Sequence, residues 1–193
     1  MIKNDKWIRE MASQGMISPF EPNQIRQIGD QKFISYGTSS YGYDLRLSPA
    51  DFRIFRHVPG EVIDPKNFNP QFLEPASLHT CAQGEYFIVP GHSYGLGVSV
   101  ERFEIPENIT VICMGKSTYA RCSLIGNVTP GEAGWKGHFT LEFSNSSSAD
   151  CRIYANEGVI QLLFLEGEPC EVSYEARKGK YQDQGLQVTL ARV

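Results

Sequence analysis

The sequence lacks the features that mark several large classes of protein. No apolar run approaches the roughly eighteen residues of a membrane-spanning helix, and no apolar segment typical of a secretory signal stands near the N-terminus. Its five cysteines are an odd number without a C-x-x-C pair, which favours free thiols in a reducing compartment over a disulfide framework. We therefore expect a cytoplasmic protein with no membrane partner.

Two catalytic signatures are missing as well. The phosphate-binding pattern G-x-x-x-x-G-K-[ST] does not occur. A zinc-dependent nucleobase deaminase carries His-x-Glu or Cys-x-Glu, followed by Pro-Cys-x-x-Cys. The chain has neither, since Pro169 and Cys170 are followed by Ser173 where the second Cys would stand. Any base deamination by this chain is therefore expected to proceed without zinc.

The composition fits one acidic globular domain. The 193 residues are 41% hydrophobic and 21% charged, with a net charge of −4, which is ordinary for a chain that buries a sizeable core. No repeat, low-complexity tract or linker divides the sequence, so we expect a single domain over residues 1–193. The negative charge argues against a broad nucleic-acid-binding face, but a small polyphosphate pocket needs only a few local cations.

Hydrophobic periodicity predicts a mainly β chain with one short helix near its N-terminal end. Asp5 can cap a helix that places Ile8 and Met11 on one face. Residues 16–30 are predicted to be irregular, and the short strands and turns that follow are typical of an antiparallel roll, barrel or sandwich. The composition of Ala176–Val193 suits a mobile arm better than a core strand. The expected strands are Tyr86–Val89, Tyr94–Val100, Thr110–Met114, Phe139–Phe143, Ile153–Ala155, Val159–Leu165 and Val172–Tyr174.

Alternation over His138–Asn145 predicts a strand with one apolar and one polar face. Phe139, Leu141 and Phe143 would point into the core. Glu142 would point the other way, towards solvent or into a lined cavity. The strand alone favours a solvated Glu, so a function for Glu142 needs support from elsewhere in the sequence.

The segment Gly115–Arg121 is the second candidate. Gly115 at the end of a strand lets backbone N–H groups approach an anion, and Lys116 with the neighbouring hydroxyls could hold phosphate oxygens. Ser117 could equally cap the start of a polar helix without binding any ligand. Arg121 lies four residues after Ser117, so the two would share one side of a helical turn.

A series of short motifs closely resembles the bacterial dCTP deaminases of the dUTPase-like superfamily. Each motif alone is weak, but their order and spacing extend over nearly the whole chain, beginning with Lys6–Arg9. The others are Ser35–Gly37, Ser39–Asp44, Asp64–Phe68, Gly115–Arg121, Asn127–Pro130, Leu141–Asn145, Tyr154–Gly158 and Gly179–Gln182.

The resemblance implies a fold, an activity and partners. Members of this family are homotrimers of a distorted jelly roll shared with dUTPases, with active sites at the subunit interfaces. They convert dCTP to dUTP and ammonia with Mg²⁺ bound to the triphosphate and without zinc. The resemblance therefore predicts a distorted jelly roll or β-roll with a closing C-terminal arm, a homotrimer, dCTP as substrate and Mg²⁺ as the accompanying ion.

The resemblance also implies roles for individual residues. By motif position, Glu142 resembles the catalytic carboxylate that shuttles protons, and Ser117 and Arg121 resemble residues that position it and the water. A carboxylate whose pKa is raised by burial can act first as a base and then as an acid. These three also count among the nucleotide-binding positions, and the others are Lys116, Thr118, Tyr119, Ala120, Thr140, Leu141, Gln161, Tyr174, Lys180 and Gln184.

Departures from the family pattern leave alternatives open. Gly126 stands where an aliphatic residue is expected, and Ala133-Gly134 replace Pro-Glu in the loop before the family's Trp. Glu132 lies roughly where dUTPases carry the Asp that activates water. A dUTPase, or a bifunctional enzyme that carries dCTP through to dUMP, is therefore one alternative. A nucleotide-binding trimer without activity is the other.

Overall fold

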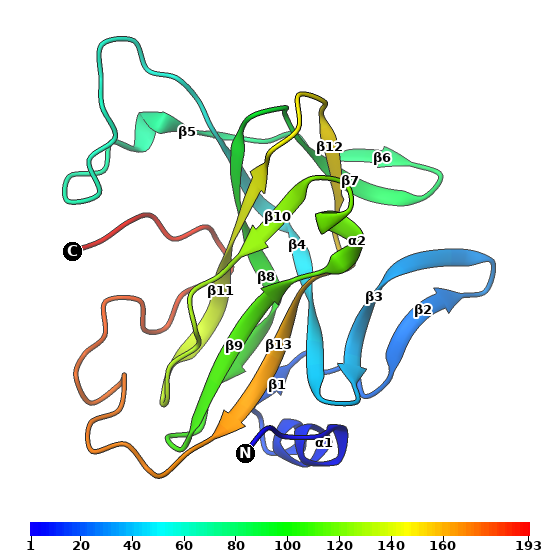
Figure 1. Ribbon diagram of the computed structural model, residues 1–193, viewed down its shortest axis with the longest axis vertical. Helices are drawn as coiled ribbons and strands as arrows, with labels where there is room; N and C mark the ends of the chain where they lie inside the picture. The colour runs from blue at the N-terminus through cyan, green and yellow to red at the C-terminus, as the bar shows by residue number, and fades with distance from the viewer.

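Antiparallel strands make up most of the regular structure, as the periodicity predicts. The computed structural model describes residues 1–193 and shows one short N-terminal helix against a curled sheet (Figure 1), so the mainly β fold is confirmed. The elements are α1 (Asp5–Ser13), β1 (Ile17–Ser18), β2 (Gln24–Ile28), β3 (Gln31–Ser39), β4 (Gly42–Phe55), the 3₁₀ helix η1 (Pro70–Phe72), β5 (Leu73–Pro75), β6 (His79–Cys81), β7 (Gly84–Val89), β8 (Tyr94–Glu104), β9 (Ile109–Gly115), α2 (Ser117–Ala120), β10 (Leu124–Asn127), β11 (Lys136–Asn145), β12 (Cys151–Tyr154) and β13 (Gly158–Glu166).

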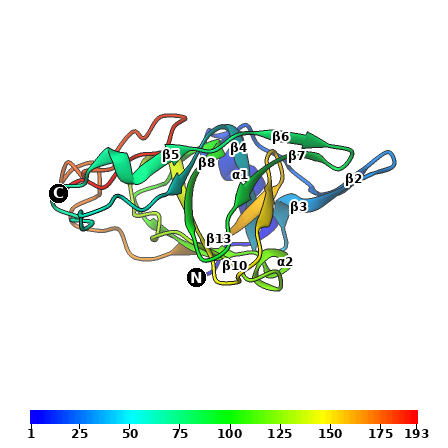
Figure 2. The same cartoon turned by 90° about the horizontal axis from the view of Figure 1, so that it is seen from above.

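One ten-stranded sheet carries the fold. Six of its strands follow one another in the order β10-β11-β8-β4-β13-β9, and β1, β2, β3 and β5 pair beside this path. A second sheet has the order β12-β7-β6. Seen from above, the strands curl around a common interior (Figure 2). A core cluster of 28 buried residues fills that interior.

Gly126 explains how the curl closes. The ends of the path, β9 and β10, meet so closely that a Cβ added to Gly115 would lie 2.9 Å from the carbonyl oxygen of Gly126. A Cβ added to Gly126 itself would lie 2.6 Å from Cδ1 of Ile160. An aliphatic residue at position 126 would therefore force Ile160 to move. The glycine in this chain matches the tight contact between the two strands.

The N-terminal segment differs from the expectation in two respects. Asn4 rather than Asp5 caps α1, because its side-chain oxygen accepts the N–H of Trp7 at 3.1 Å, whereas the Asp5 carboxylate pairs with Arg9 at 2.6 Å. Residues 16–30 are also less irregular than predicted, since they contain β1 and β2. β2 forms a hairpin with β3, a pairing that its polar sequence did not indicate.

The predicted strand at Val172–Tyr174 is wrong, whereas the pattern of β11 is confirmed. Tyr174 buries its ring, but its N–H donates to the carbonyl of Ala133 at 2.8 Å in a loop-to-loop contact and joins no ladder. In β11, Phe139, Leu141 and Phe143 are buried, and Glu142 is only partly buried.

The segment Ala176–Val193 contains no helix or strand and lies beside β11 (Figure 1). Trp135 Nε1 donates to the carbonyl of Tyr181 at 2.7 Å, and the N–H of His138 donates to the carbonyl of Gln184 at 2.9 Å. Val188 is buried near the end of the segment. These contacts hold the arm against the body of the protein.

Neither helix of the fold has the length and apolar character that a bilayer crossing requires.

Candidate active site

A cavity of about 700 Å³ lies between β11, the loop before it, the segment around Phe55–Leu73 and the C-terminal arm. Half of its lining residues are hydrophobic, with polar side chains among them. This mixture is typical of a site that binds a small organic ligand and orients it. Five of the predicted catalytic and nucleotide-binding residues line the cavity: Thr140, Glu142, Tyr174, Lys180 and Gln184.

Glu142 presents a carboxylate whose two oxygens are in different surroundings. Oε2 accepts a hydrogen bond from Asn127 Nδ2 at 2.7 Å and another from the hydroxyl of Tyr94 at 3.5 Å. Oε1 accepts no hydrogen bond from the chain. Burial, and next the charge of Glu142, raise the pKa of Tyr94 to about 12, so Tyr94 stays a neutral donor near pH 7. Hydrogen bonds thus hold the Glu142 side chain through Oε2, and Oε1 stays available to accept a proton.

Aromatic rings form the apolar walls of the cavity. Trp135 stacks on Phe139 with ring centroids 4.4 Å apart. Phe55 meets Tyr94 edge to face at 5.7 Å and Phe68 at 6.1 Å. Such rigid, flat surfaces suit a planar heterocycle.

The arm closes one side of the cavity. Thr140 Oγ1 donates to Gln184 Oε1 at 2.8 Å, and the N–H of Tyr181 donates to the hydroxyl of Tyr174 at 3.0 Å. The Lys180 ammonium is exposed and donates to the carbonyl of Arg192 at 2.6 Å. The arm therefore brings Lys180 and Gln184 to the cavity that contains Glu142.

Glu132, the other carboxylate of the cavity wall, forms an ion pair with Arg177 of the arm. This pair closes the gap between the loop before β11 and the arm. The Glu132 carboxylate is engaged by a cation of its own chain, whereas Glu142 contacts only neutral donors.

The residues of Lys116–Arg121 do not line this cavity. Lys116 Nζ donates to Asp44 Oδ2 at 2.7 Å and to Ser35 Oγ at 3.1 Å, so its charge is paired inside its own chain. Asp44 is 1% exposed, and its other carboxylate oxygen has no hydrogen-bond partner. The Lys116 side chain therefore anchors α2 to the sheet.

The other residues of this turn divide into one buried and several exposed side chains. Tyr119 is in the core, where its hydroxyl accepts the N–H of Tyr154 at 2.9 Å. Arg121 is exposed and donates to the carbonyl of Ser117 at 3.2 Å, without contact to Glu142. Thr118 and Ala120 are exposed as well.

The two remaining residues lie on opposite faces of the sheet. Leu141 is fully buried, so only its backbone is open to a ligand. Gln161 lies on β13 opposite Met114 of β9 and is partly exposed. Three hydrophobic side chains of this region are unusually exposed: Ile112 (41%), Met114 (54%) and Ile125 (52%).

Sequence reasoning did not assign the two residues that contact Glu142. Asn127 could have been found, since it opens the motif before the loop and pairs with Glu142 across β10 and β11. Tyr94 gave no such signal, because it comes from β8 and reaches Glu142 only through the fold.

Comparison with known proteins identifies the family. A model of the dCTP deaminase-like family matches residues 2–167. The dCTP deaminase of Laribacter hongkongensis is 51% identical over 194 residues, which cover 99% of this chain and 98% of that protein. The dCTP deaminase of Coxiella burnetii is 53% identical over 185 residues, 95% of each chain.

A solved structure gives the same fold. The crystal structure of 2′-deoxycytidine 5′-triphosphate deaminase from Agrobacterium tumefaciens aligns with a TM-score of 0.60 at 16% identity. The alignment covers 86% of this chain and 46% of that one, so the chain spans less than half the length of that protein. At this identity the likeness shows the fold alone. The family match over residues 2–167 and the relatives at about half identity show that the chain belongs to the dCTP deaminase-like family.

Proposed function

We propose that the protein hydrolyses dCTP to dUTP and ammonia. The observation that carries the proposal is the Glu142 carboxylate, which faces an aromatic-walled cavity with Oε2 held by two donors and Oε1 free. The relatives named dCTP deaminase supply the substrate. A cytoplasmic location stays a prediction.

The chemistry requires one group that both removes and returns protons. Water adds to C4 of cytosine while Glu142 takes its proton through Oε1 and passes it to N3. The tetrahedral intermediate then gives its hydroxyl proton to Glu142, which delivers it to the amino group as the C4–N4 bond breaks. The products are ammonia and a uracil that keeps the proton on N3. Asn127 and Tyr94 hold Oε2 throughout, so that Oε1 faces the reacting atoms.

We further propose that the complete site forms between neighbouring copies in a homotrimer. Glu142 and the arm residues belong to the cavity, whereas Ser117, Arg121 and Gln161 lie outside it. Exposed apolar side chains near this second group are typical of a surface that another protein covers. Placing α2 of one copy against the cavity of the next would join the two groups around one nucleotide.

Mg²⁺ is proposed to enter with the nucleotide. Residues 1–193 contain no group of three or more His, Cys, Asp or Glu side chains arranged to hold an ion, so the phosphate oxygens would supply the main ligands. When bound, Mg²⁺ would offset much of the triphosphate charge. Lys180 could then contact the remaining charge from the arm. Catalysis without zinc stays a prediction.

Incubation with dCTP and with dUTP, each with Mg²⁺, tests this assignment. We expect ammonia and dUTP from dCTP in equal amounts, and no dUMP or pyrophosphate from dUTP at a comparable rate. Absence of ammonia would contradict the deaminase. Rapid pyrophosphate release would instead support the bifunctional alternative, which rests on the position of Glu132 in the cavity wall. The ion pair of Glu132 with Arg177 argues against that role.

Replacing Gly137 by Ala should weaken substrate binding by displacing the arm. Gly137 has φ +138°, and a Cβ there would lie 2.7 Å from the backbone nitrogen of Gln184. Because lid closure governs access and binding, we expect the KM for dCTP to rise roughly tenfold while kcat changes less. Gly185→Ala is the matched control, since an added Cβ there meets no atom within 4 Å. Equal KM values for the two variants would show that arm docking does not contribute to binding.

A further inference from the structure

The central strand β8 loses its regular pairing on both sides at nearly the same place. On the β11 side, residues 99–101 of β8 stand opposite Phe139 alone. On the β4 side, residues 48–51 stand opposite Val98 alone. Bulges of this kind leave backbone groups without ladder partners and redirect the neighbouring side chains.

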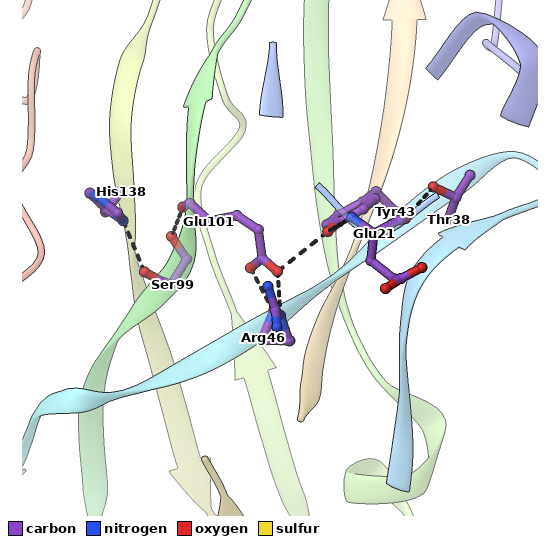
Figure 3. Close-up of polar contacts among 7 residues, drawn as sticks. All are labelled: Glu21, Thr38, Tyr43, Arg46, Ser99, Glu101 and His138. Carbon is purple, nitrogen blue, oxygen red and sulfur yellow. Dashed lines mark hydrogen bonds and ion pairs between the residues drawn. The ribbon is translucent and has the colours of Figure 1, made fainter. Parts of the chain in front are cut away.

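Two buried side chains of β8, Ser99 and Glu101, bond to backbone N–H groups of the neighbouring strands β11 and β4. Figure 3 shows the contacts of Glu101 with Arg46 and Tyr43. Ser99 Oγ accepts from the N–H of Phe139 at 2.9 Å and donates to the carbonyl of Glu101 at 2.6 Å. The Glu101 carboxylate accepts from the N–H of Arg46 at 2.9 Å and pairs with its guanidinium at 2.7 Å. Ser99 and Glu101 are both 0% exposed, so water cannot replace either side chain.

The same network reaches further on both sides. His138 Nδ1 lies 3.0 Å from the carbonyl of Ser99, which adds a second link to β11. The Tyr43 hydroxyl donates to Glu101 at 3.4 Å and accepts the N–H of Glu21 at 3.2 Å. Burial raises the pKa of the Glu101 carboxyl, and Arg46 opposes that rise. Side-chain hydrogen bonds therefore link residues 99–101 of β8 to β4 on one side and to β11 on the other.

Phe139, the β11 residue whose N–H bonds to Ser99, immediately precedes the site residue Thr140. The backbone of Phe139 is fixed by Ser99, and its ring forms a cavity wall against Trp135. Thr140 follows directly, and Glu142 lies one alternation further along the same face of β11. A shift of Phe139 would therefore move Thr140 and Glu142 relative to the cavity.

We propose that Ser99 is a positioning residue for the reaction: its hydroxyl fixes β11 at Phe139 and thereby sets the place of Thr140 and Glu142. This inference rests on the proposed deaminase function. Ser99 is fully buried and does not line the cavity, so its side chain would not reach a substrate bound there. Its effect reaches the reaction only through the backbone of β11.

Ser99→Ala tests the proposal, because it removes the acceptor of the Phe139 N–H without adding bulk. Since misplacement of a catalytic group by about 1 Å can cost on the order of a hundredfold, we expect kcat for ammonia release to fall about 10- to 100-fold. The KM for dCTP should stay within about threefold, because Trp135 and His138, which precede Phe139, still hold the arm even if Thr140 shifts. Amide hydrogen exchange at Phe139 and Thr140 should become faster.

Ser48→Ala is the matched control. Ser48 is also buried, at 2% exposed, and its hydroxyl accepts the N–H of Ala50 at 3.1 Å in the β4 bulge, but it makes no hydrogen bond to β11. We expect its melting temperature to fall about as much as that of Ser99→Ala, with kcat within about twofold of wild type. Ser99→Thr keeps the hydroxyl and should retain kcat within about threefold of wild type.

Wild-type kcat in Ser99→Ala, or an equal loss of kcat in Ser48→Ala, would overturn the positioning role. If Ser99→Ala does not fold, Ser99→Cys carries the same expectation, because a thiol of similar size is a weaker acceptor. A wild-type protein that releases no ammonia would contradict the proposed function instead. In that case, unchanged amide exchange at Phe139 in Ser99→Ala would still count against the link between Ser99 and β11.

Discussion

Glu142→Gln is expected to lose ammonia release from dCTP while still binding the nucleotide. The amide has nearly the same shape, and its oxygen can still accept the hydrogen bonds from Asn127 and Tyr94. It cannot take a proton from water or return one to the leaving amine. Because positioned acid–base groups contribute about 10²- to 10⁴-fold, we expect kcat to fall on the order of a thousandfold.

The measurement combines steady-state ammonia release with calorimetric titration of dCTP in the presence of Mg²⁺. The Kd of the variant should stay within about tenfold of wild type, since the amide keeps the shape of the side chain and its place on the binding surface. Glu132→Gln is the matched control, because it removes a second carboxylate from the same cavity wall. It should retain its kcat. More than a tenth of wild-type turnover in Glu142→Gln would rule out Glu142 as the proton shuttle.

Local periodicity was sufficient to predict the strand β11 and its two faces, because the alternation of apolar and polar residues lies entirely within that strand. The alternation of Phe139, Leu141 and Phe143 with polar residues fixes the face on which Glu142 lies, whatever the neighbouring strands are. The same local argument failed at Val172–Tyr174. Burial there comes from contacts with the loop before β11, and tertiary contacts of this kind leave no period in the sequence.

The surroundings of the site depend on contacts between distant segments. Tyr94 is 48 residues from Glu142 in the chain, and Lys116 is 72 residues from Asp44. In the sequence, a lysine in a turn beside hydroxyl side chains indicates an anion-binding site. The sequence does not show whether the charge of that lysine is already paired with a carboxylate of the same chain. Only the fold shows that Lys116 is paired, which leaves Arg121 as the exposed cation of that turn.

Arg121→Ala should lower kcat on the order of a hundredfold, because loss of a positioned charge near the reaction typically costs this much. The side chain is exposed and bonds to the carbonyl of Ser117, so the melting temperature and the assembly of the proposed trimer should be unaffected. The structure places Arg121 outside the cavity that contains Glu142. Combined with Glu142→Gln, the variant therefore also tests which copy of the chain supplies each half of the site.

Co-expression of Arg121→Ala with Glu142→Gln separates the two arrangements. If each site takes Glu142 from one copy and Arg121 from the next, trimers that contain both chains should recover about a third of wild-type activity, because one of their three interfaces combines two intact halves. If both residues act within one copy, every site carries one defect and the mixture stays at the level of the single variants. Mixed trimers purified through two different tags, compared with the separately purified variants, give the readout. Recovery would support a site completed by the neighbouring copy, whereas no recovery in trimers shown to contain both chains would contradict it.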